Sequence, residues 1–314
     1  MNMIKKKILY NLIIKIILIL LIFPFYFLLL KKLSIIKKIK TALCVIAKKE
    51  NKYIKEFIDY YKNLGINTIY LYDNNDIEGE NFDIILKNYI KNKFVKIINF
   101  RGLIRPQQLA YIQCYNNNKY NYDWIAFYDV DEFLYFKNYK KIYNFLSLSK
   151  FNNCSSLLIN WKYYGDNNNI FYKSKPLKER FIKPFYFSKK YKNIYLYAAA
   201  KSLVRGGLNI TWEHFPHFLK DQIICRPNGE IITNPLSPPN YSIAFIKHYA
   251  TKSTEEFAEK LLKGAVNSNN TLNKIYWVNT IKNYYFILNK RNKDKIKLFE
   301  KKLNIKINYD FKNI

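Results

Sequence analysis

Apolar runs alternate with amphipathic stretches along the first part of the chain. Four short runs are almost continuously apolar or aromatic, which is typical of strands covered on both faces, and they cover residues 42–47, 68–72, 94–98 and 124–128. Between them apolar residues recur at helical spacing, and the predicted helices begin near residues 54, 82 and 107. The repeated order of strand and helix predicts an α/β fold with a mostly parallel, doubly wound sheet and helices on both faces.

The second part of the chain is less regular. It contains an apolar strand at Ser156–Trp161 and a short one at Phe245–His248, with long polar and aromatic loops between them. Ser253 and Glu256 have the spacing of a capping box, which predicts the start of a helix. These elements predict that the second part completes the same domain.

The N-terminus carries an apolar run from Ile8 to Leu30 between a basic stretch, residues 1–7, and a basic linker, residues 31–40. Crossing a bilayer as a helix takes about 20 apolar residues, so the run predicts a transmembrane anchor. A cleavable signal peptide is the alternative, but its apolar core is shorter and ends in small residues. More lysines follow the run than precede it, which favours the cytosolic side for the rest of the chain; the side stays open.

Composition adds a strong positive charge. The formal net charge is +30, but the lysines are spread evenly and form no isolated basic block, so no specific nucleic-acid partner is expected. The charge predicts attraction to anions such as phosphates. The cysteines Cys44, Cys114, Cys154 and Cys225 are far apart, and neither a zinc site nor a disulfide framework follows from their spacing; Cys44 and Cys114 are expected in the core.

Three carboxylates directly follow the aromatic strand that ends at Tyr128. They are Asp129, Asp131 and Glu132, and in an open α/β sheet ligands bind beyond the carboxyl ends of the strands. Crowded carboxylates repel each other, so a divalent cation is expected among them, and without it one carboxylate should hold its proton more tightly. By the same reasoning, loss of Asp131 should cost the metal-free protein little stability. A solvated turn is the alternative.

Several segments, in this order, resemble glycosyltransferase family 92 and the related family-2-like transferases. They are Glu50, Leu64-Gly-Ile-Asn-Thr-Ile-Tyr-Leu-Tyr-Asp73, Trp124 with Asp129-Val-Asp131-Glu-Phe, Lys201-Ser202, and His248-Tyr with Lys252-Ser. The resemblance covers residues 41–264. It implies a GT-A fold, a nucleotide-sugar donor, a divalent metal (Mn²⁺ or Mg²⁺) and inversion at the anomeric carbon.

The resemblance also implies roles for single residues. Asp131 would ligate the metal, and Asp129 would bind the donor ribose or the metal. His248 would be a further metal ligand; the alternative is an ordinary buried histidine. Asp73 would contact a uracil-type base, although Asp73-Asn-Asn75 is also good turn chemistry. Arg105 and Gln108, at the start of the helix before the acid cluster, would meet the donor or simply lie at the surface.

Direct displacement also needs a general base near the acceptor hydroxyl. Glu213 and Asp166 are the candidates, because each lies in a loop with aromatic residues of the kind that pack on sugar rings. His214 and His217 beside Glu213 have the spacing of a metal-binding pair, and packing within a loop is the alternative. Neither carboxylate is singled out by its spacing.

The expected organisation is therefore one GT-A domain, residues 41–314, behind the anchor. Residues 41–135 would bind the nucleotide sugar, which is expected to be a UDP-sugar. Residues 136–314 would form the half that binds the glycan or glycoconjugate acceptor and would include the C-terminal helices. Two other classes stay open: a metal-dependent phosphate enzyme such as a nuclease or nucleotidyltransferase, and a catalytically degenerate, membrane-associated binding protein. A nuclease would carry more acidic ligands or a recognisable motif, and a degenerate fold would have lost the aspartates.

Overall fold

The computed structural model describes residues 19–20, 23, 39–185, 198–214, 218–234, 236–263, 281 and 293–307. The anchor predicted at residues 8–30 falls almost entirely outside this described part, as do residues 1–7 and most of the linker. Within the described ranges, no helix is both long enough and apolar enough to cross a membrane. The account below concerns the compact unit that begins at Ile39.

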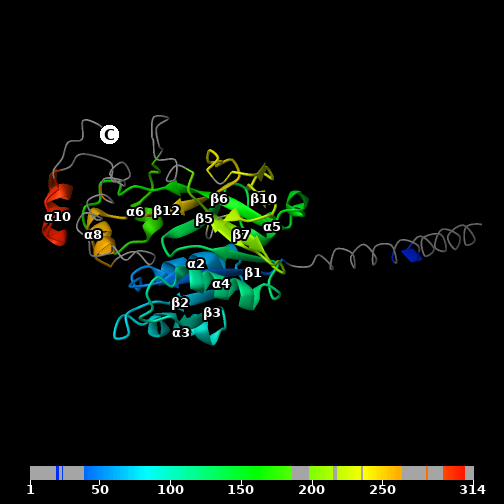
Figure 1. The fold of residues 1–314 in the computed structure, drawn as a ribbon, viewed down its shortest axis with the longest axis horizontal. Helices are drawn as coiled ribbons and strands as arrows, with labels where there is room; N and C mark the ends of the chain where they lie inside the picture. The colour runs from blue at the N-terminus through cyan, green and yellow to red at the C-terminus, as the bar shows by residue number, and fades with distance from the viewer. Residues whose placement is uncertain are drawn as a thin grey trace, which may run out of the picture. The chain divides into compact units, whose positions relative to one another are not determined.

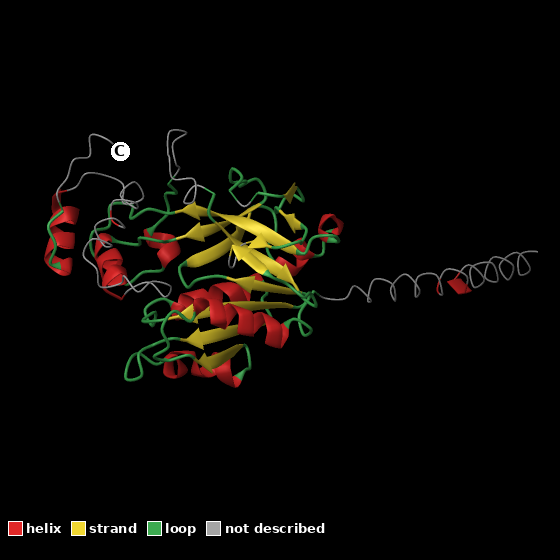
Figure 2. Cartoon of the chain, in the orientation of Figure 1, coloured by secondary structure: helices red, strands yellow, loops and turns green. Residues whose placement is uncertain are grey.

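The alternation of strands and helices predicted for the first part of this unit is confirmed. The elements are β1 (Thr41–Ala47), α2 (Ile54–Leu64), β2 (Thr68–Asp73), α3 (Phe82–Lys91), β3 (Val95–Asn99), α4 (Gln107–Asn118) and β4 (Trp124–Phe127). Strand β1 pairs in parallel with β2 and β4, and β2 pairs in parallel with β3. Figure 2 shows the helices alongside these strands.

Side-chain alternation along β1 explains why helices cover both faces of the sheet. Leu43 and Val45 pack in one cluster with the apolar stripes of α2 and α3. Ala42 and Cys44 pack on the other face, with α4. Successive side chains of a strand point to opposite faces, so the continuous apolar run of β1 is buried from both sides.

The remaining elements make the sheet mixed. They are β5 (Glu132–Phe136), α5 (Ile142–Leu146), η1 (Ser149–Phe151), β6 (Ser156–Tyr163), α6 (Leu177–Arg180), β7 (Ala200–Arg205), β8 (Trp212–His214), β9 (Phe218–Leu219), β10 (Ile224–Cys225), β11 (Ile231–Ile232), β12 (Ala244–His248), α8 (Thr254–Lys263) and α10 (Lys293–Leu303). The central strand order is β11-β10-β6-β7-β4-β1-β2-β3 (Figure 1).

Strand β7 breaks the parallel pattern, because it pairs antiparallel with both β4 and β6. A parallel connection needs a crossover helix, and the described part between β6 and β7 contains only the short helix α6. The prediction of a mostly parallel sheet is therefore confirmed from β1 to β4. Beyond β4 the sheet is mixed: β7 is antiparallel to both of its neighbours, whereas β6 pairs in parallel with β10 and β12.

The cysteines form two disulfides, which the sequence analysis did not predict. Cys44 of β1 is bonded to Cys114 of α4, with the Cα atoms 6.3 Å apart. Cys154, just before β6, is bonded to Cys225 of β10, with the Cα atoms 5.8 Å apart. The partners are 70 and 71 residues apart in sequence, so their proximity follows from tertiary packing and not from spacing.

Candidate active site

The acid cluster lies in the tight turn between β4 and β5. The chain leaves the sheet at Phe127 and re-enters it at Glu132. Within the turn the backbone N–H of Asp129 donates to Oε2 of Glu132 at 3.0 Å, and the N–H of Glu132 donates to the carbonyl of Asp129 at 3.0 Å. The predicted strand end is confirmed, and the turn holds the three carboxylates together.

Strand β12 brings His248 to these carboxylates. It pairs antiparallel with β5, and in this register His248 lies opposite Glu132. Ligand atoms of Asp131, Glu132 and His248 lie within 4.8 Å of one another, and all three residues are buried. Nε2 of His248 is 3.6 Å from Oδ1 of Asp131. Of the predicted metal ligands, Asp131 and His248 come together, and Glu132 takes the place expected for Asp129.

The donor atoms of this group fit a divalent cation. Nδ1 of His248 and Oε1 of Glu132 are buried and make no hydrogen bond to the described residues. Two carboxylates and an imidazole suit Mn²⁺ or a similar divalent ion. Burial lowers the pKa of His248 and so favours the neutral form, which carries the lone pair that a metal needs.

Lysines supply much of the positive charge that the sequence analysis assigned to a metal. Lys201 of β7 contacts Oδ2 of Asp129 at 2.7 Å and lies 3.5 Å from Oε1 of Glu132. Lys260 of α8 contacts Oδ2 of Asp131 at 2.6 Å, and Lys252 lies 3.9 Å from the same oxygen. The carboxylates are therefore compensated even without a cation.

This compensation is uneven, and the pKa values differ accordingly. Burial opposes ionisation of Asp131, but Lys260, Lys252 and His248 outweigh it and hold its pKa well below the usual value. Burial also raises the pKa of Glu132, and Lys201 does not offset it. The raised pKa of Glu132 agrees in direction with the prediction that one carboxylate holds its proton more tightly when no metal is bound. For Asp131 the lysines lead us to expect a larger stability effect than the sequence suggested, because its loss would remove the carboxylate that faces both Lys260 and Lys252.

Asp129 is held by side chains from both faces of the sheet. Besides Lys201, its Oδ1 accepts hydrogen bonds from the Tyr111 hydroxyl at 3.0 Å and from Nε2 of Gln107 at 3.2 Å. Both of these residues lie on α4. The helix expected to meet the donor therefore contacts Asp129 through Gln107, one residue before Gln108, which is exposed. Arg105 is exposed as well, in the loop before α4 with a φ of 53°.

Asp73 ends β2 at the carboxyl edge of the sheet. Its Oδ1 accepts hydrogen bonds from the backbone N–H and the side-chain amide of Asn75, and its Oδ2 accepts one from Arg101 at 2.8 Å. The turn alternative for Asp73 is therefore present in the structure. Asp73, Asn99 and Arg101 line a cavity of about 460 Å³. Arg101 lies just beyond β3, but no sequence pattern singled it out as a site residue.

A smaller polar pocket of about 180 Å³ lies between the end of β1 and α8. Its lining includes Lys252 and Lys260, which both approach Asp131, and Lys263, which is paired with Glu50. Lys252 and Glu50 belong to the segments that resemble the family. The sequence did not predict a role for Lys252, Lys260 or Lys263. Their ammonium groups are the natural partners of phosphate oxygens.

The two candidate bases are placed very differently. Asp166 is fully buried and is paired with Lys295 of α10. Asn168 donates a backbone hydrogen bond to the same carboxylate at 3.0 Å. This arrangement indicates a structural role and leaves the carboxylate no exposed surface toward an acceptor. Glu213 lies on β8, but its side chain is not among the parts that the structure describes. Its role as a base therefore stays a prediction.

Comparison with known proteins identifies a family. The model of glycosyltransferase family 92 matches residues 40–294. A family 92 protein of Arabidopsis thaliana is 31% identical over 107 residues, covering 32% of this chain and 18% of that protein. Another, from Ricinus communis, is 24% identical over 93 residues, covering 30% of this chain and 16% of that protein. The aligned parts are thus a small share of these relatives.

Comparison with solved structures gives weaker matches, including the following two. S. aureus TarS 1–349 in complex with UDP has 15% identity and a TM-score of 0.36, covering 84% of this chain and 71% of that chain. The mannosyltransferase PcManGT from Pyrobaculum calidifontis, in complex with GDP-Man and Mn²⁺, has 9% identity and a TM-score of 0.29, covering 40% of this chain and 36% of that chain. Because these scores are low, the family rests on the sequence match.

Proposed function

The chain belongs to glycosyltransferase family 92, and from this premise we propose that it transfers a sugar from a nucleotide-sugar donor to a glycan or glycoconjugate acceptor. The observation that carries the proposal is the buried group of Asp131, Glu132 and His248, with Lys252 and Lys260 beside it. The group lies in the turn after β4, at the carboxyl edge where open α/β sheets bind ligands. We also propose that the sheet is that of a GT-A fold.

The donor diphosphate would bind at the pocket between β1 and α8. Lys252 and Lys260 both face the carboxylate of Asp131. From these positions their ammonium groups could contact phosphate oxygens in place of Asp131. Asp131, Glu132 and His248 would hold a divalent metal, preferably Mn²⁺ or Mg²⁺, which when bound neutralises negative charge on a leaving diphosphate. The lysines would stabilise the same charge as it develops.

The nucleoside would bind at the neighbouring strand ends. Asp73 and Arg101 line the cavity of about 460 Å³ at the carboxyl ends of β2 and β3. Arg101 also donates to the backbone carbonyls of Asp76 and Ile77 at 2.7 and 2.9 Å, and so holds the loop that closes one side of this cavity. We propose a uridine nucleotide as the donor, with Asp73 shaping the contact to its base.

The reaction would be a direct displacement with inversion. The acceptor oxygen forms a bond to the anomeric carbon while the bond between that carbon and the diphosphate oxygen breaks. The proton of the acceptor hydroxyl passes to a general base, for which we propose Glu213, and the electron pair leaves with the nucleoside diphosphate. Lys201 and α4 keep Asp129 in place beside the donor throughout.

The cysteines support a proposal for the side of the membrane. All four are paired in disulfides, which persist in oxidising compartments and are rare in the cytosol. We propose that residues 8–30 anchor the chain as a single pass and that the catalytic domain lies on the oxidising side. The lysine distribution favoured the cytosolic side, so a glycosylation or protease-protection assay decides between the two.

The test of the function is a donor screen with the full-length chain in detergent. Titration with UDP, GDP and CDP sugars, each with Mn²⁺, Mg²⁺ or EDTA, is expected to give metal-dependent binding of a uridine donor and slow release of its sugar to water. A nuclease or nucleotidyltransferase would instead cleave or form phosphodiester bonds. Absence of binding by every nucleotide sugar would refute the proposal.

A further inference from the structure

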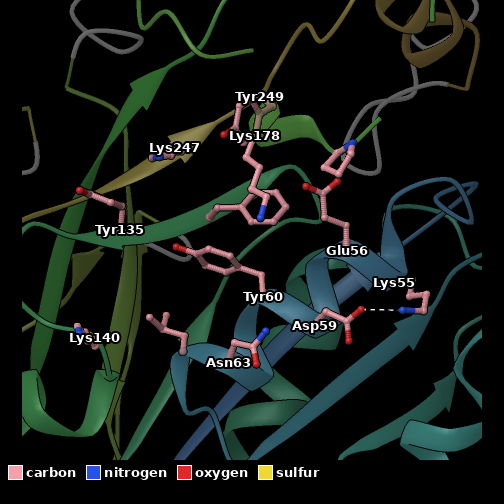
Figure 3. Close-up of a pocket in the computed structure, with 13 residues that line it drawn as sticks. Lys55, Glu56, Asp59, Tyr60, Asn63, Tyr135, Lys140, Lys178, Lys247 and Tyr249 are labelled. Atoms are coloured by element: carbon pink, nitrogen blue, oxygen red, sulfur yellow. Dashed lines mark hydrogen bonds and ion pairs between the residues drawn. The ribbon is translucent and has the colours of Figure 1, made fainter. Parts of the chain in front are cut away.

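A second cavity lies away from the acid cluster. It has a volume of about 680 Å³ and is bounded by α2 on one side and by the ribbon of β5 and β12 on the other. Figure 3 shows Tyr60 of α2 pointing toward Tyr135 of the ribbon, with Lys247 above them, whereas Asp59 of α2 turns away toward Lys55. The size is in the range of pockets that bind small molecules or a few sugar units.

The register of the ribbon separates this cavity from the acid cluster. Directly opposed residues of an antiparallel pair share a face, and successive residues alternate between faces. Glu132 of the acid cluster lies opposite His248, and both belong to the candidate metal-binding group. The next pair, Phe133 and Lys247, faces the other side, as does Tyr135 two residues further along. The two sites therefore lie on opposite faces of the antiparallel pair of β5 and β12, whose strand β12 also pairs with β6.

Aromatic rings form the walls of this cavity. The Tyr135 side chain is 37% exposed, although it lies in the middle of a strand. Tyr60, across the cavity, is held by a hydrogen bond from its hydroxyl to the carbonyl of Leu134 at 2.5 Å and by edge contact with Phe133, with ring centroids 5.0 Å apart. Such rings offer a rigid apolar face with a polar edge, which suits the C–H face and hydroxyl rim of a sugar ring.

The charge of the lining is positive. Its two acids are engaged within the protein, since Asp59 is paired with Lys55 at 2.7 Å and Glu56 accepts the N–H of Leu177 at 3.0 Å. The remaining lining cations are Lys140, Lys178 and Lys247, and no ion pair of these three with an acid is found within the part of the chain that the structure describes. Lys247 lies 4.6 Å from the centre of the Tyr135 ring, so cation and aromatic face act together.

We propose that this cavity binds an anionic saccharide, with a sugar ring against Tyr135 and Tyr60 and a carboxylate or phosphate near Lys247. The anionic charge follows from the lining, and the saccharide class rests on the proposed function. The site anchors part of the acceptor chain on the face of the ribbon opposite the transfer chemistry. Its backbone contact with the acid cluster is direct, because the N–H of Tyr249 donates to the carbonyl of Asp131 at 2.9 Å.

The experiment is calorimetric titration of the full-length chain in detergent with three probes. They are a tetramer of galacturonate, the same tetramer with its carboxyl groups methyl-esterified, and mannose 6-phosphate. We expect the charged tetramer or the sugar phosphate to bind. If the charged tetramer binds, the esterified tetramer should bind at least about tenfold more weakly, because it lacks the charge-assisted contact. The arm that binds tells whether carboxylate or phosphate is preferred.

Variants locate the binding. Lys247→Ala and Tyr135→Ala should each weaken it about tenfold, whereas Lys87→Ala, at an exposed position of α3, should leave it unchanged. Melting curves confirm that each variant is folded. The proposal is overturned if the esterified tetramer binds as tightly as the charged one, if both cavity variants bind as well as the wild type, or if no probe binds. A parallel titration with UDP and Mn²⁺ separates its failure from that of the proposed transferase activity, because that titration uses the other face.

Discussion

Replacing Asp131 by Asn tests how the acid cluster is held together. The substitution keeps the shape of the side chain and removes its charge. In the wild type this carboxylate faces Lys260 at 2.6 Å and Lys252 at 3.9 Å, and its side chain is only 8% exposed. Lys252 is even more buried, so Asp131→Asn leaves a buried ammonium group without the carboxylate that lies 3.9 Å from it.

The expected cost follows from that unpaired charge. Removing one partner of a buried ion pair typically destabilises a protein by about 3–5 kcal/mol. We expect the lower end, about 3 kcal/mol, because Lys260 is partly exposed and Glu50 also acts on Lys252. If repulsion among the carboxylates dominated the site until a metal relieved it, the result would be the opposite. Asp131→Asn would then stabilise the metal-free protein.

The assay is urea unfolding followed by tryptophan fluorescence, with EDTA and then with Mn²⁺ and UDP. At a ligand concentration 100 times Kd, the wild type should gain about 2.7 kcal/mol of unfolding free energy, and Asp131→Asn should gain almost nothing. The control is Asp76→Asn: Asp76 contacts Lys48 at 2.7 Å but is half exposed, so its loss should cost less than about 1 kcal/mol. A variant as stable as the wild type in EDTA would refute the electrostatic reasoning, and one still stabilised by Mn²⁺ and UDP would refute the ligand role.

Three further predictions concern other parts of the domain. Arg180→Met should destabilise it by about 3–5 kcal/mol in urea unfolding, because Glu256 is buried and accepts hydrogen bonds from both terminal guanidinium nitrogens of Arg180, at 2.7 and 2.9 Å; an unchanged midpoint would contradict this. Asp73→Ala should reduce the preference for UDP over GDP and CDP in competition binding, and an unaltered preference would remove Asp73 from base selection. Replacing Cys154 and Cys225 together by Ser should cost about 2–4 kcal/mol, and maleimide should label no thiol in unreduced, denatured wild type.

The local patterns of the sequence were sufficient for the first half of the fold. Helix α2 shows why: its buried residues are Ile54, Phe57, Ile58, Tyr61 and Leu64, all at helical spacing. Gly65 follows with a φ of 99° and ends the helix. Propensity and period agree in such elements, so the prediction needs no knowledge of tertiary contacts.

What the sequence did not reveal depends on contacts between distant segments. The counter-ions of the acid cluster are an example, because Lys201 is 72 residues from Asp129 and Lys260 is 129 residues from Asp131. A lysine-rich chain offers no local signal for which lysines are buried. The same holds for the disulfides and for β7, whose antiparallel place between β4 and β6 follows from the path of the chain after β6.

The ribbon of β5 and β12 lets the two proposed sites change independently. Leu134 lies opposite Ile246, and both are fully buried, so a shift of one residue in register would move this apolar pair out of the core. The register is therefore held firmly, and with it the position of His248 opposite Glu132. Substitutions at Tyr135 on the other face leave that register intact. A chain of this design can alter the saccharide that it recognises on one face while the acid cluster on the other face keeps its geometry.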